Sequence, residues 1–481
     1  MSSWLPIPFR VVILGGGLSG LAAAHTVLKH AQVPTQVTVI ESQNRFGGWL
    51  ESTRFNDGTV FEHGPRSGRS YGNVALDALS LLSDIGIDDK FIGVPKSNDA
   101  ASRRYIYYNG QILELPRGLA LAKKWGPLPK SLLGLMIREP FVKKSDLDDM
   151  SVHEFFRRRF NCEEIADYLA DPLCHGIFGW NSKQLSLRSC FPMLFDYEKN
   201  YGSVVKGALL SKGNKPPISS LSNKAKEQQW MAWSVKGGMQ TLPELWSQHL
   251  IEKGLQCHLN TECKKLKIEF TTDSRKIHIE TNNGTFEADH VISTLSAPVL
   301  LDMSKIKHYV TCYKIFGILN MAVMTLQYSG EKIPHSGFGY LVPSKEKLDI
   351  LGVTFDSHIF PEHALENSST VTVMAGGPRF HELFGEKADE NTATEIAVRS
   401  VRDTLNFKSE PIKNVTKMHR NCIPQYHVGH YKTAENIRNY LLEQNLPLSI
   451  MGNMWGGPGV NDVIVNARNN TMTWLTNNHL C

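Results

Sequence analysis

The first residues whose spacing could do chemistry are three glycines near the start of the chain. Gly15, Gly17 and Gly20 have the G-x-G-x-x-G spacing. The first glycine of this pattern permits a tight turn, the second lets backbone approach a pyrophosphate, and the third lets a helix pack closely on a strand. A phosphate would lie at the helix N-terminus, where unpaired N–H groups and the helix dipole favour an anion. The glycines therefore predict a pyrophosphate-binding turn.

The flanking residues supply the elements that such a turn requires. Residues 11–14 predict a short buried strand, and residues 18–30, rich in Ala and Leu, predict a helix. Residues 36–41 predict a second strand that ends at Glu41, whose carboxylate is expected to meet a ribose hydroxyl. Strand, glycines, helix, strand and acid follow the order of a dinucleotide-binding βαβ unit. The alternative is a glycine-rich turn in an ordinary α/β sheet.

A second glycine turn follows Glu41 directly. Arg45, Gly47 and Gly48 complete the pattern E-x-x-x-R-x-G-G, and two glycine turns so close together exceed what a nicotinamide dinucleotide needs. This arrangement resembles the flavin-containing amine oxidase superfamily. Five further stretches are similar to the porphyrinogen-oxidising members of that superfamily and are spread over nearly the whole chain. They are FEHGPRSGR (61–69), NSKQLSLRSCFPMLF (181–195), GFGYLVP (337–343), ILGVTFDSHIFPEH (350–363) and GGPGVND (456–462).

The resemblance implies an FAD enzyme of haem biosynthesis. It would oxidise protoporphyrinogen IX to protoporphyrin IX in three two-electron steps, with dioxygen as acceptor and hydrogen peroxide as by-product. The implied fold is a doubly wound, Rossmann-like α/β FAD-binding domain with an α+β substrate-binding domain and a helical membrane-associated domain. We expect the FAD-binding domain at residues 1–90, 230–300 and 441–481, the helical domain at 91–229 and the substrate-binding domain at 301–440.

The FAD contacts that the resemblance implies come from both ends of the chain. Trp49 and the segment from Gly64 would lie beside the isoalloxazine, and the helix expected from Val460 would direct its positive end at the flavin. Ser67 replaces the glycine of many relatives, and Pro458 lacks an N–H donor. The expected cofactor residues are Gly15, Gly16, Gly17, Leu18, Ser19, Gly20, Glu41, Ser42, Trp49, Gly64, Pro65, Arg66, Ser67, Cys263, Asn453, Pro458, Gly459 and Val460.

Arg66 is the leading candidate for substrate binding. The implied substrate carries propionate carboxylates, and a guanidinium can bind one of them with two parallel hydrogen bonds. The alternative role for Arg66 is an ion pair at the surface or beside the flavin. By the same resemblance, an apolar tetrapyrrole pocket would be lined by Gly176, Phe338, Gly339, Leu341 and Met374, which taken alone are ordinary core residues. No residue stands out as a general base, because His63 beside a glycine turn is weak evidence, and we assign no catalytic residue.

Beyond these stretches, the sequence pattern predicts helices, an exposed connector and strands. Residues 152–174 predict helices, and residues 211–229 predict an exposed connector. Alternation on both sides of Asn283-Gly284 predicts a hairpin followed by a buried strand. Several strand-like runs within residues 301–440 predict an antiparallel sheet. The glycine loop near the C-terminus is expected to meet the N-terminal turns on one bound molecule.

Composition restricts the partners. The 481 residues carry a net charge of only +5, which gives no case for nucleic acid. The eight cysteines are scattered and form no C-x-x-C motif, which argues against disulfides and metal sites. No signal peptide and no run of 18 apolar residues is recognisable. Residues 117–136 mix aliphatic runs with Lys123, Lys124, Trp125 and Lys130, which fits either a peripheral membrane contact or buried core with solvated lysines.

The resemblance also implies a location in the cell and leaves two alternative functions open. Eukaryotic members lie on the mitochondrial inner membrane, facing the intermembrane space. The sequence leaves open whether the chain forms a homodimer. One rival is another flavin oxidase or desaturase of the superfamily, acting on an amine or a carotenoid. The other is a flavin-free, lipid-binding chaperone of the Rab GDP-dissociation inhibitor type. Gly15, Gly17 and Gly20 with Glu41, together with residues 456–462, favour the flavin enzyme.

Overall fold

A five-stranded parallel sheet is assembled from segments spread over the whole chain. The computed structural model describes residues 8–211, 219–270, 275–304 and 316–481. It orders this sheet β10-β2-β1-β14-β20. The strands are β1 (Phe9–Leu14), β2 (Thr35–Ile40), β10 (Gln256–His258), β14 (His290–Ser293) and β20 (Leu448–Ile450). Residues 11–14 are all buried, as expected for a parallel strand covered on both faces.

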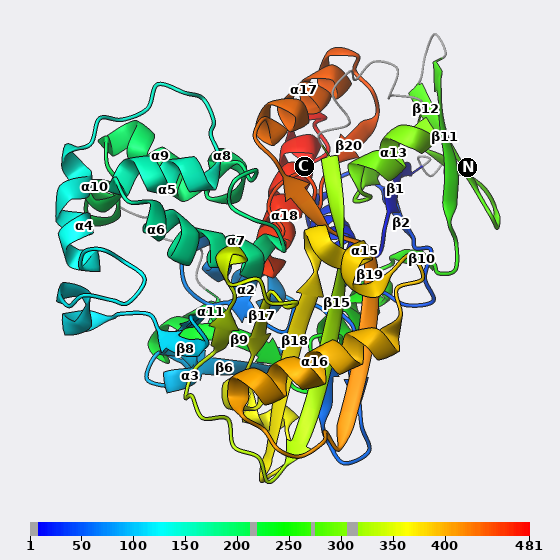
Figure 1. The fold of residues 1–481 in the computed structure, drawn as a ribbon. Coiled ribbons are helices and arrows are strands. Elements are labelled where there is room, and N and C mark those ends of the chain that lie inside the picture. Colours follow the sequence, from blue (N-terminus) through cyan, green and yellow to red (C-terminus); the bar gives the residue numbers. More distant parts are fainter. Residues whose placement is uncertain (1–7, 212–218, 271–274, 305–315) are drawn as a thin grey trace, which may run out of the picture.

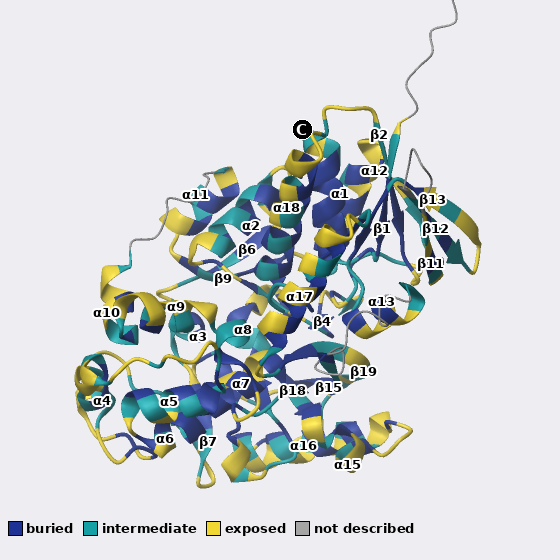
Figure 2. Cartoon of the chain, turned by 90° about the horizontal axis from the view of Figure 1, so that it is seen from above, coloured by how far each residue is buried: buried dark blue, intermediate teal, exposed yellow. Residues whose placement is uncertain are grey.

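Two layers cover this sheet. One face packs against the helices α1 (Leu18–His30), α2 (Asn73–Ser83), α12 (Thr241–Glu252) and α18 (Val460–Asn477). The other face packs against α13 (Ala297–Ser304), α17 (His430–Glu443) and the antiparallel strands β11 (Cys263–Phe270), β12 (Arg275–Thr281) and β13 (Gly284–Ala288). Figure 2 shows α1 and the neighbouring strands mostly in the colour of buried residues. The predicted Rossmann-like α/β unit is confirmed, and helix α1 has the predicted bounds.

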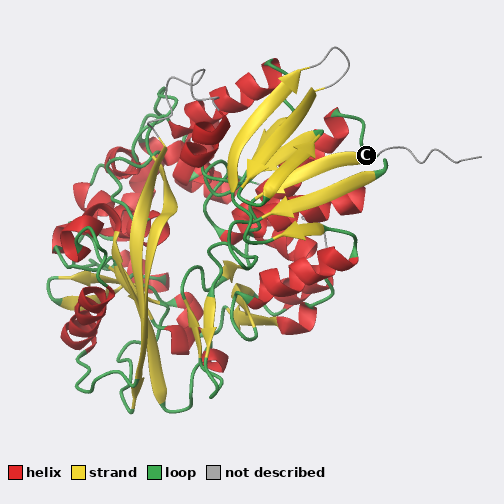
Figure 3. Cartoon of the chain, turned by 90° about the vertical axis from the view of Figure 1, so that its right-hand side faces the viewer, coloured by secondary structure: helices red, strands yellow, loops and turns green. Residues whose placement is uncertain are grey.

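A seven-stranded mixed sheet forms the second large layer, separate from the first sheet in Figure 3. Its order is β19-β15-β18-β17-β16-β7-β8. The strands are β7 (Tyr105–Tyr108), β8 (Gln111–Glu114), β15 (Phe316–Ser329), β16 (Gly339–Leu341), β17 (Gly352–Thr354), β18 (Ser368–Gly376) and β19 (Lys413–Tyr426). Helices α15 (Phe380–Phe384) and α16 (Glu390–Leu405) pack on one face. Every pair is antiparallel except β16 with β7, which is parallel.

Two small sheets connect the large ones. The strands β3 (Ser52–Arg54) and β4 (Val60–Glu62) form a hairpin, and β5 (Gly68–Arg69), β9 (Trp230–Val235) and β6 (Phe91–Pro95) form a three-stranded sheet. Two glycines permit close packing of tryptophan rings here. A Cβ atom on Gly93 would lie 1.8 Å from Trp230 Cε2, and one on Gly68 would lie 2.3 Å from Trp233 Cε2. The hairpin and this sheet hold the segment around Arg66 between the two large sheets.

Short helices form a lobe at one side of the molecule, on the left in Figure 1. They are α4 (Leu132–Arg138), α5 (Val152–Phe160), α6 (Glu163–Ile165), α7 (Asp171–Phe178), α8 (Leu187–Cys190), α9 (Pro192–Tyr201) and α10 (Val204–Leu210). The buried Arg159 donates from Nε to Glu139 Oε1 at 2.6 Å, and Glu139 also accepts from Val204 N at 2.9 Å. Within the described ranges, no helix combines the length and the apolar character needed to cross a bilayer.

The helical region differs from its expected extent. Residues 91–115 include β6, β7 and β8, which belong to sheets: β6 pairs with β9, and β7 pairs with β16 and β8. Helix α11 (Ser220–Glu227) buries Leu221 in the core beside α1 and α2, so this part of the predicted connector is an ordered helix. Residues 212–218 of that connector lie outside the described residues. Trp125 is buried and donates from Nε1 to Glu114 O at 2.9 Å, so it does not face an interface.

Candidate active site

The first glycine turn has the geometry expected of a phosphate-binding turn. Gly15 has a φ of +98°, and a Cβ atom there would lie 2.4 Å from Thr294 Oγ1. A Cβ atom on Gly20 would lie 2.0 Å from Gly15 O, so α1 can pack onto β1 only without side chains at these positions. Gly17 precedes Leu18 at the start of α1, and no side chain caps this end. The first N–H groups of α1 are therefore available to an anion.

The second glycine turn faces the first. Gly47 N donates to Gly16 O at 2.9 Å, and a Cβ atom on Gly17 would lie 4.0 Å from Gly48 Cα. Gly17 has an ordinary φ of −71° and does not require glycine for conformational reasons. The two turns thus leave a space free of side chains in front of the α1 N-terminus. This space fits the pyrophosphate of a dinucleotide.

Glu41 lies at the carboxyl end of β2, beside the same turns. Its Oε2 accepts from Gly16 N at 2.7 Å, while Oε1 accepts from Gln43 N at 2.8 Å and lies 3.2 Å from Ser42 Oγ. Thr261 N donates to Glu41 O at 2.8 Å, which brings the start of β11 at Cys263 close to this end of the strand. The carboxylate is therefore held in a fixed orientation at the edge where the ribose was expected.

The C-terminal loop meets the N-terminal segment directly. Arg69 Nη2 lies 2.8 Å from Asp462 Oδ1, and Asn461 Nδ2 donates to Arg69 O at 2.8 Å. Gly457 N donates to the hydroxyl of Tyr426 at 3.0 Å, and this hydroxyl also donates to Asn453 O. Helix α18 begins at Val460 after Gly459, again without a side-chain cap. The two ends of the chain are therefore in contact here, which is the arrangement that the predicted convergence on one bound molecule requires.

A cavity of about 730 Å³ lies where these segments meet the seven-stranded sheet. Its size is within the range of small-molecule sites. It brings together the expected cofactor residues Trp49, Gly64, Pro65, Arg66, Asn453 and Pro458 with all the expected substrate residues, Arg66, Gly176, Phe338, Gly339, Leu341 and Met374. The remaining expected cofactor residues are not part of its lining: Gly15, Gly16, Gly17, Leu18, Ser19, Gly20, Glu41, Ser42, Ser67, Cys263, Gly459 and Val460.

The cavity wall is mainly apolar. Trp49, Leu173 and Ile177 are exposed apolar side chains that line it, and the described lining contains no carboxylate. Two guanidinium groups, those of Arg66 and Arg104, are its charged members. The wall therefore suits a flat apolar molecule that carries acidic groups.

Arg66 is already engaged within the protein. Its Nη1 lies 2.8 Å from Asp356 Oδ1 and donates to the hydroxyl of Thr354. Asp356 also accepts from that hydroxyl at 2.9 Å. The structure thus contains the ion pair that was the alternative role for Arg66. Glu62 lies nearby, and burial raises the pKa of its carboxyl to about 7 against the opposing effect of a hydrogen bond from Met239 N.

Arg104 is a site residue that sequence reasoning missed. Its guanidinium stacks over the ring of Phe338 at 4.5 Å and donates to the carbonyls of Ala100 and Arg103. No carboxylate pairs with it among the described residues, and desolvation lowers the pKa of the group. The neighbouring Arg103, by contrast, lies 3.3 Å from Asp99. Nothing in the local sequence distinguishes the two arginines, because the difference depends on which side of β7 faces the cavity.

Two histidines lie on the cofactor side of the cavity. His63 is 1% exposed, its Nε2 lies 2.7 Å from Thr53 Oγ1, and its Nδ1 has no hydrogen-bond partner in the described structure. Burial, reinforced by Lys417, lowers the pKa of His63 to about 4. His419 Nε2 lies 2.6 Å from His63 O. Both imidazoles are therefore neutral near neutral pH. The Nδ1 atom of His63 is thus a buried polar atom without a hydrogen-bond partner in the described structure.

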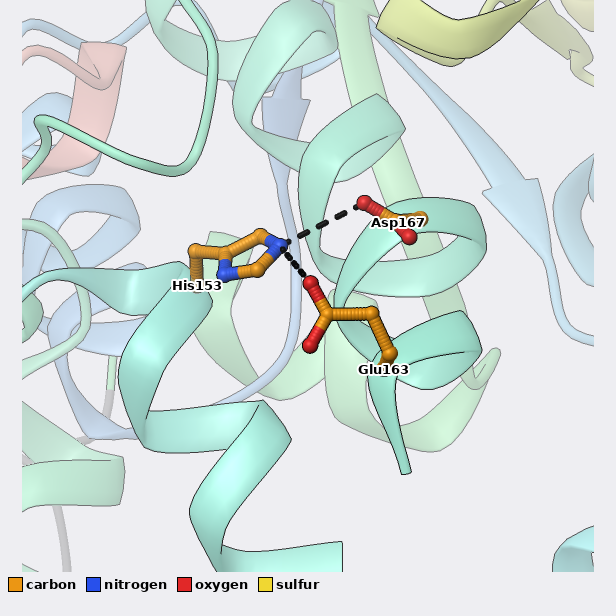
Figure 4. A group of neighbouring side chains, drawn as sticks. All are labelled: His153, Glu163 and Asp167. Carbon is orange, nitrogen blue, oxygen red and sulfur yellow. Dashed lines mark hydrogen bonds and ion pairs between the residues drawn. The ribbon is translucent and has the colours of Figure 1, made fainter. Parts of the chain in front are cut away.

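A separate group of titratable side chains lies in the helical lobe (Figure 4). His153 Nε2 lies 3.3 Å from Asp167 Oδ1 and 3.4 Å from Glu163 Oε1. Lys345 Nζ lies 2.6 Å from Asp167 Oδ2, and Arg157 Nε lies 4.0 Å from Glu163 Oε2. These cations already neutralise the carboxylates. The group is an ion-pair cluster that joins α5 to α6 and the following turn, and we assign no metal to it.

The fold and the site together define an α/β protein with a dinucleotide-binding type of glycine turn and a large, mainly apolar cavity. Comparisons of the sequence with known proteins agree with this description. The family model described as "Flavin containing amine oxidoreductase" matches residues 18–453, and the chain belongs to this family. The family confirms the predicted FAD as cofactor. The facing glycines and the uncapped N-termini of α1 and α18 fit such a group.

Individual members of the family are similar to this chain over nearly its whole length. The chain is 36% identical over 474 residues to the "Protoporphyrinogen oxidase" of Homo sapiens, covering 95% of this chain and 96% of the relative. It is 28% identical over 475 residues to the "Coproporphyrinogen III oxidase" of Bacillus subtilis, covering 95% of each. A solved structure of a putative protoporphyrinogen oxidase from Exiguobacterium superposes with a TM-score of 0.78, at 20% identity and over 99% of this chain and all of that one. That last likeness supports the fold alone.

Proposed function

We propose that this chain is an FAD-dependent oxidoreductase of haem biosynthesis that oxidises protoporphyrinogen IX to protoporphyrin IX. The observation that carries the proposal is the composition of the cavity wall. It is apolar, lacks carboxylates in its described part and contains two guanidinium groups. Protoporphyrinogen carries two propionates, so one guanidinium is available for each. Two cations in a wall without a described carboxylate disfavour an amine, which is itself a cation at neutral pH.

FAD supplies the two-electron chemistry, and the chain supplies binding and orientation. The facing turns at Gly17 and Gly48 would hold the pyrophosphate, and Glu41 would hold the adenosine ribose. Trp49, the segment 64–67 and the C-terminal loop would surround the ring. Arg66 and Arg104 would orient the macrocycle through its carboxylates, while the apolar wall excludes water from the reacting carbon.

Dioxygen is the acceptor in this proposal, with hydrogen peroxide as product. The decisive assay loads the protein with FAD and follows porphyrin fluorescence from protoporphyrinogen IX, with a blank that contains no protein. Oxidation faster than the autoxidation blank supports the proposal, and a rate equal to the blank overturns it. Coproporphyrinogen III, which carries four propionates, is the comparison substrate. A preference for it would assign the chain the activity that the name of the Bacillus subtilis relative states.

In this proposal each of the three expected domains has its own role. Residues 1–90, 230–300 and 441–481 would bind FAD, residues 301–440 would form the main substrate wall, and residues 91–229 would contribute the helical lobe. Strands β7 and β8 extend the substrate wall from within that last segment. Arg104 immediately precedes β7, which explains how a residue of the lobe segment comes to line the cavity.

The helical lobe is the proposed site of peripheral membrane contact. Leu119 and Phe141 are 92% and 87% exposed, and the lobe also exposes Ile137, Leu147, Met193, Leu209 and Leu210. Exposed lysines at 123, 124, 143 and 144 accompany these apolar groups, a combination suited to an anionic lipid surface. The mitochondrial inner membrane, on its intermembrane-space side, is the membrane that the resemblance implies. We propose no homodimer interface.

Sedimentation with liposomes that contain anionic lipid tests this contact. The double variant L119S/F141S should lose most of its binding while it oxidises substrate normally in detergent. Leu442 on α17 is 71% exposed and lies outside the lobe, so L442S is the matched control and should bind as the unmodified protein does. Equal binding by the double variant and the control would contradict a contact through the lobe.

A further inference from the structure

His419 occupies the boundary between the two halves of the cavity. It lies on β19 directly opposite Met321 of β15, and both residues line the cavity. Its ring packs edge-on against Trp49, with 5.6 Å between ring centroids and an interplanar angle of 88°. Trp49 belongs to the expected flavin segment, whereas Met321 belongs to the sheet that forms the substrate wall. The imidazole is therefore placed where substrate and cofactor would meet.

The hydrogen bonds around His419 select one tautomer. Its Nε2 lies 2.6 Å from His63 O, and a carbonyl oxygen only accepts, so Nε2 carries the hydrogen. The carbonyl is itself fixed, because His63 is buried and its N donates to Glu51 O at 2.9 Å. In the neutral ring, Nδ1 then holds a lone pair. It has no hydrogen-bond partner in the described part of the chain, and the partly exposed ring lines the cavity.

The charges around His419 keep it neutral. Lys417 Nζ lies 3.1 Å from Glu51 Oε1, and Arg45 Nη2 lies 3.5 Å from Glu51 Oε2, so the nearby carboxylate is shared between two cations. Burial is the main cause that lowers the pKa of His419 below its ordinary value of 6.5. The hydrogen bond to His63 O and the charge of Glu51 oppose this effect, and Lys417 and Arg45 add to it.

Other groups in the cavity wall are poorer proton acceptors. Arg66 and Arg104 are cations. Cys422 donates from Sγ to Leu319 O at 3.3 Å, and burial raises the pKa of its thiol to about 12. The Nδ1 atom of His63 is enclosed by protein. His419 is thus the lining residue that combines a neutral, basic nitrogen with access to the cavity.

We propose that His419 is the proton acceptor of the oxidation, taking on Nδ1 the proton that the macrocycle releases in each two-electron step. The inference rests on the proposed function. Over the three steps three bridge C–H bonds would break with loss of hydride, while two pyrrole N–H bonds and the fourth bridge C–H bond would break with loss of a proton. The electron pairs that the three protons leave behind form the three new double bonds of the conjugated ring. In each step the hydride, with its electron pair, passes to the flavin, so the macrocycle is oxidised and the flavin reduced. The proton passes to Nδ1, which makes the ring an imidazolium.

His419 also holds the proton that the reduction of dioxygen requires. Reduction of dioxygen to hydrogen peroxide takes up that hydride together with one proton, and the imidazolium of His419 holds one. The ring then returns to the neutral tautomer for the next of the three steps. A base in this position contributes about 100-fold or more to the rate of a reaction with this kind of proton transfer.

Single-turnover reduction of the FAD-loaded enzyme by protoporphyrinogen under anaerobic conditions tests the proposal. Glutamine can still donate to His63 O but is not basic, so H419Q separates positioning from proton transfer. We expect H419Q to reduce the rate constant about 100-fold with little change in the substrate Kd, and added imidazole to restore part of the rate in H419A. The unmodified enzyme should slow as pH falls below 6.5, and H419Q should lose that dependence. H381Q, which alters an exposed histidine outside the cavity lining, is the control.

A second readout does not depend on turnover. ¹⁵N-histidine NMR of the substrate-free holoenzyme, assigned with H419Q, should show protonated Nε2 and unprotonated Nδ1 at His419. Protonation of Nδ1 would overturn the proposal, as would an H419Q rate constant within about threefold of the unmodified value. These failures differ from failure of the proposed function, in which the unmodified holoenzyme itself would not oxidise protoporphyrinogen above the blank. In that case the inference falls with the function.

Discussion

Arg66 Nη1 lies 2.8 Å from Asp356 Oδ1, although 290 residues separate them in the sequence. The ion pair joins the segment beside the expected flavin to the sheet that forms the substrate wall. In the described structure Nε and Nη2 of Arg66 have no hydrogen-bond partner, so the guanidinium can bind a second acid. Asp356 then holds Arg66 in place and at the same time weakens its attraction for the substrate.

Substitution at the two ends of this pair should act in opposite directions. R66A removes a charged hydrogen-bond donor, so KM for protoporphyrinogen should rise about tenfold or more. D356N keeps a hydrogen-bonding side chain but removes the competing charge, so KM should stay level or fall. Steady-state porphyrin fluorescence measures both values. If R66A left KM and rate untouched, the assignment of Arg66 to the substrate would be wrong.

Arg104 should matter for binding and not for the fold. It has no carboxylate partner in the described structure, so R104M loses no internal ion pair but loses a propionate anchor. We expect KM to rise about tenfold or more while Tm does not fall. The adjacent Arg103 pairs with Asp99, and R103M is the matched control, expected to keep the unmodified KM. The assignment fails if both variants change KM equally.

Gly17 should be required by the cofactor and not by the backbone. Its φ of −71° is ordinary, and an added Cβ would be 4.0 Å from Gly48 Cα, so G17A should fold normally. The added methyl group would occupy the space expected for the pyrophosphate, so Kd for FAD should rise about tenfold or more. Titration of apoprotein by flavin fluorescence measures this change.

Two further glycines provide the comparison. G126A adds a Cβ with ordinary contacts far from the turns, 3.5 Å from Tyr108 Cε1, and should leave FAD binding unchanged. G20A would place its Cβ 2.0 Å from Gly15 O and should destabilise the fold itself. Unaltered FAD affinity in G17A would show that the pyrophosphate does not lie between Gly17 and Gly48.

His290 should make the protein sensitive to acid. It is buried, stacks on Trp474 with 4.2 Å between ring centroids, and its Nε2 lies 2.9 Å from Ser449 Oγ. Burial lowers its pKa to about 3 from 6.5. The folded state therefore binds fewer protons than the unfolded chain, and stability present above pH 6.5 is lost as pH falls toward 3. At pH 5 this loss amounts to about 2 kcal/mol.

Urea denaturation at pH 7 and pH 5 measures that loss. In H290Q the difference in free energy of unfolding between the two pH values should shrink by about 2 kcal/mol, whatever the variant's stability at pH 7. The exposed His381 provides the control, because H381Q should keep the full difference. A difference in H290Q equal to that of the unmodified protein would show that His290 does not remain neutral in the fold.

Local sequence patterns determined the parts of this protein that depend on short-range physics. The turn at Gly15, helix α1 over residues 18–30, the strand ending before Glu41 and the start of α18 at Val460 all follow from glycine spacing and hydrophobic periodicity. Backbone conformation and the burial of one face depend on neighbours within a few residues. The family resemblance also pointed to residues that the structure brings together in one cavity, among them Trp49, Arg66 and Leu341.

Only the tertiary structure decided which side chains meet across the chain. The pairing of β7 with β16 brings Arg104 to the cavity, and the contacts of β19 with residues that follow the second glycine turn place His419 near Trp49. The partner of Arg66, the missing partner of Arg104 and the tautomer of His419 depend on atoms hundreds of residues away. Charge pairing and desolvation are set by three-dimensional distances, which no local periodicity encodes.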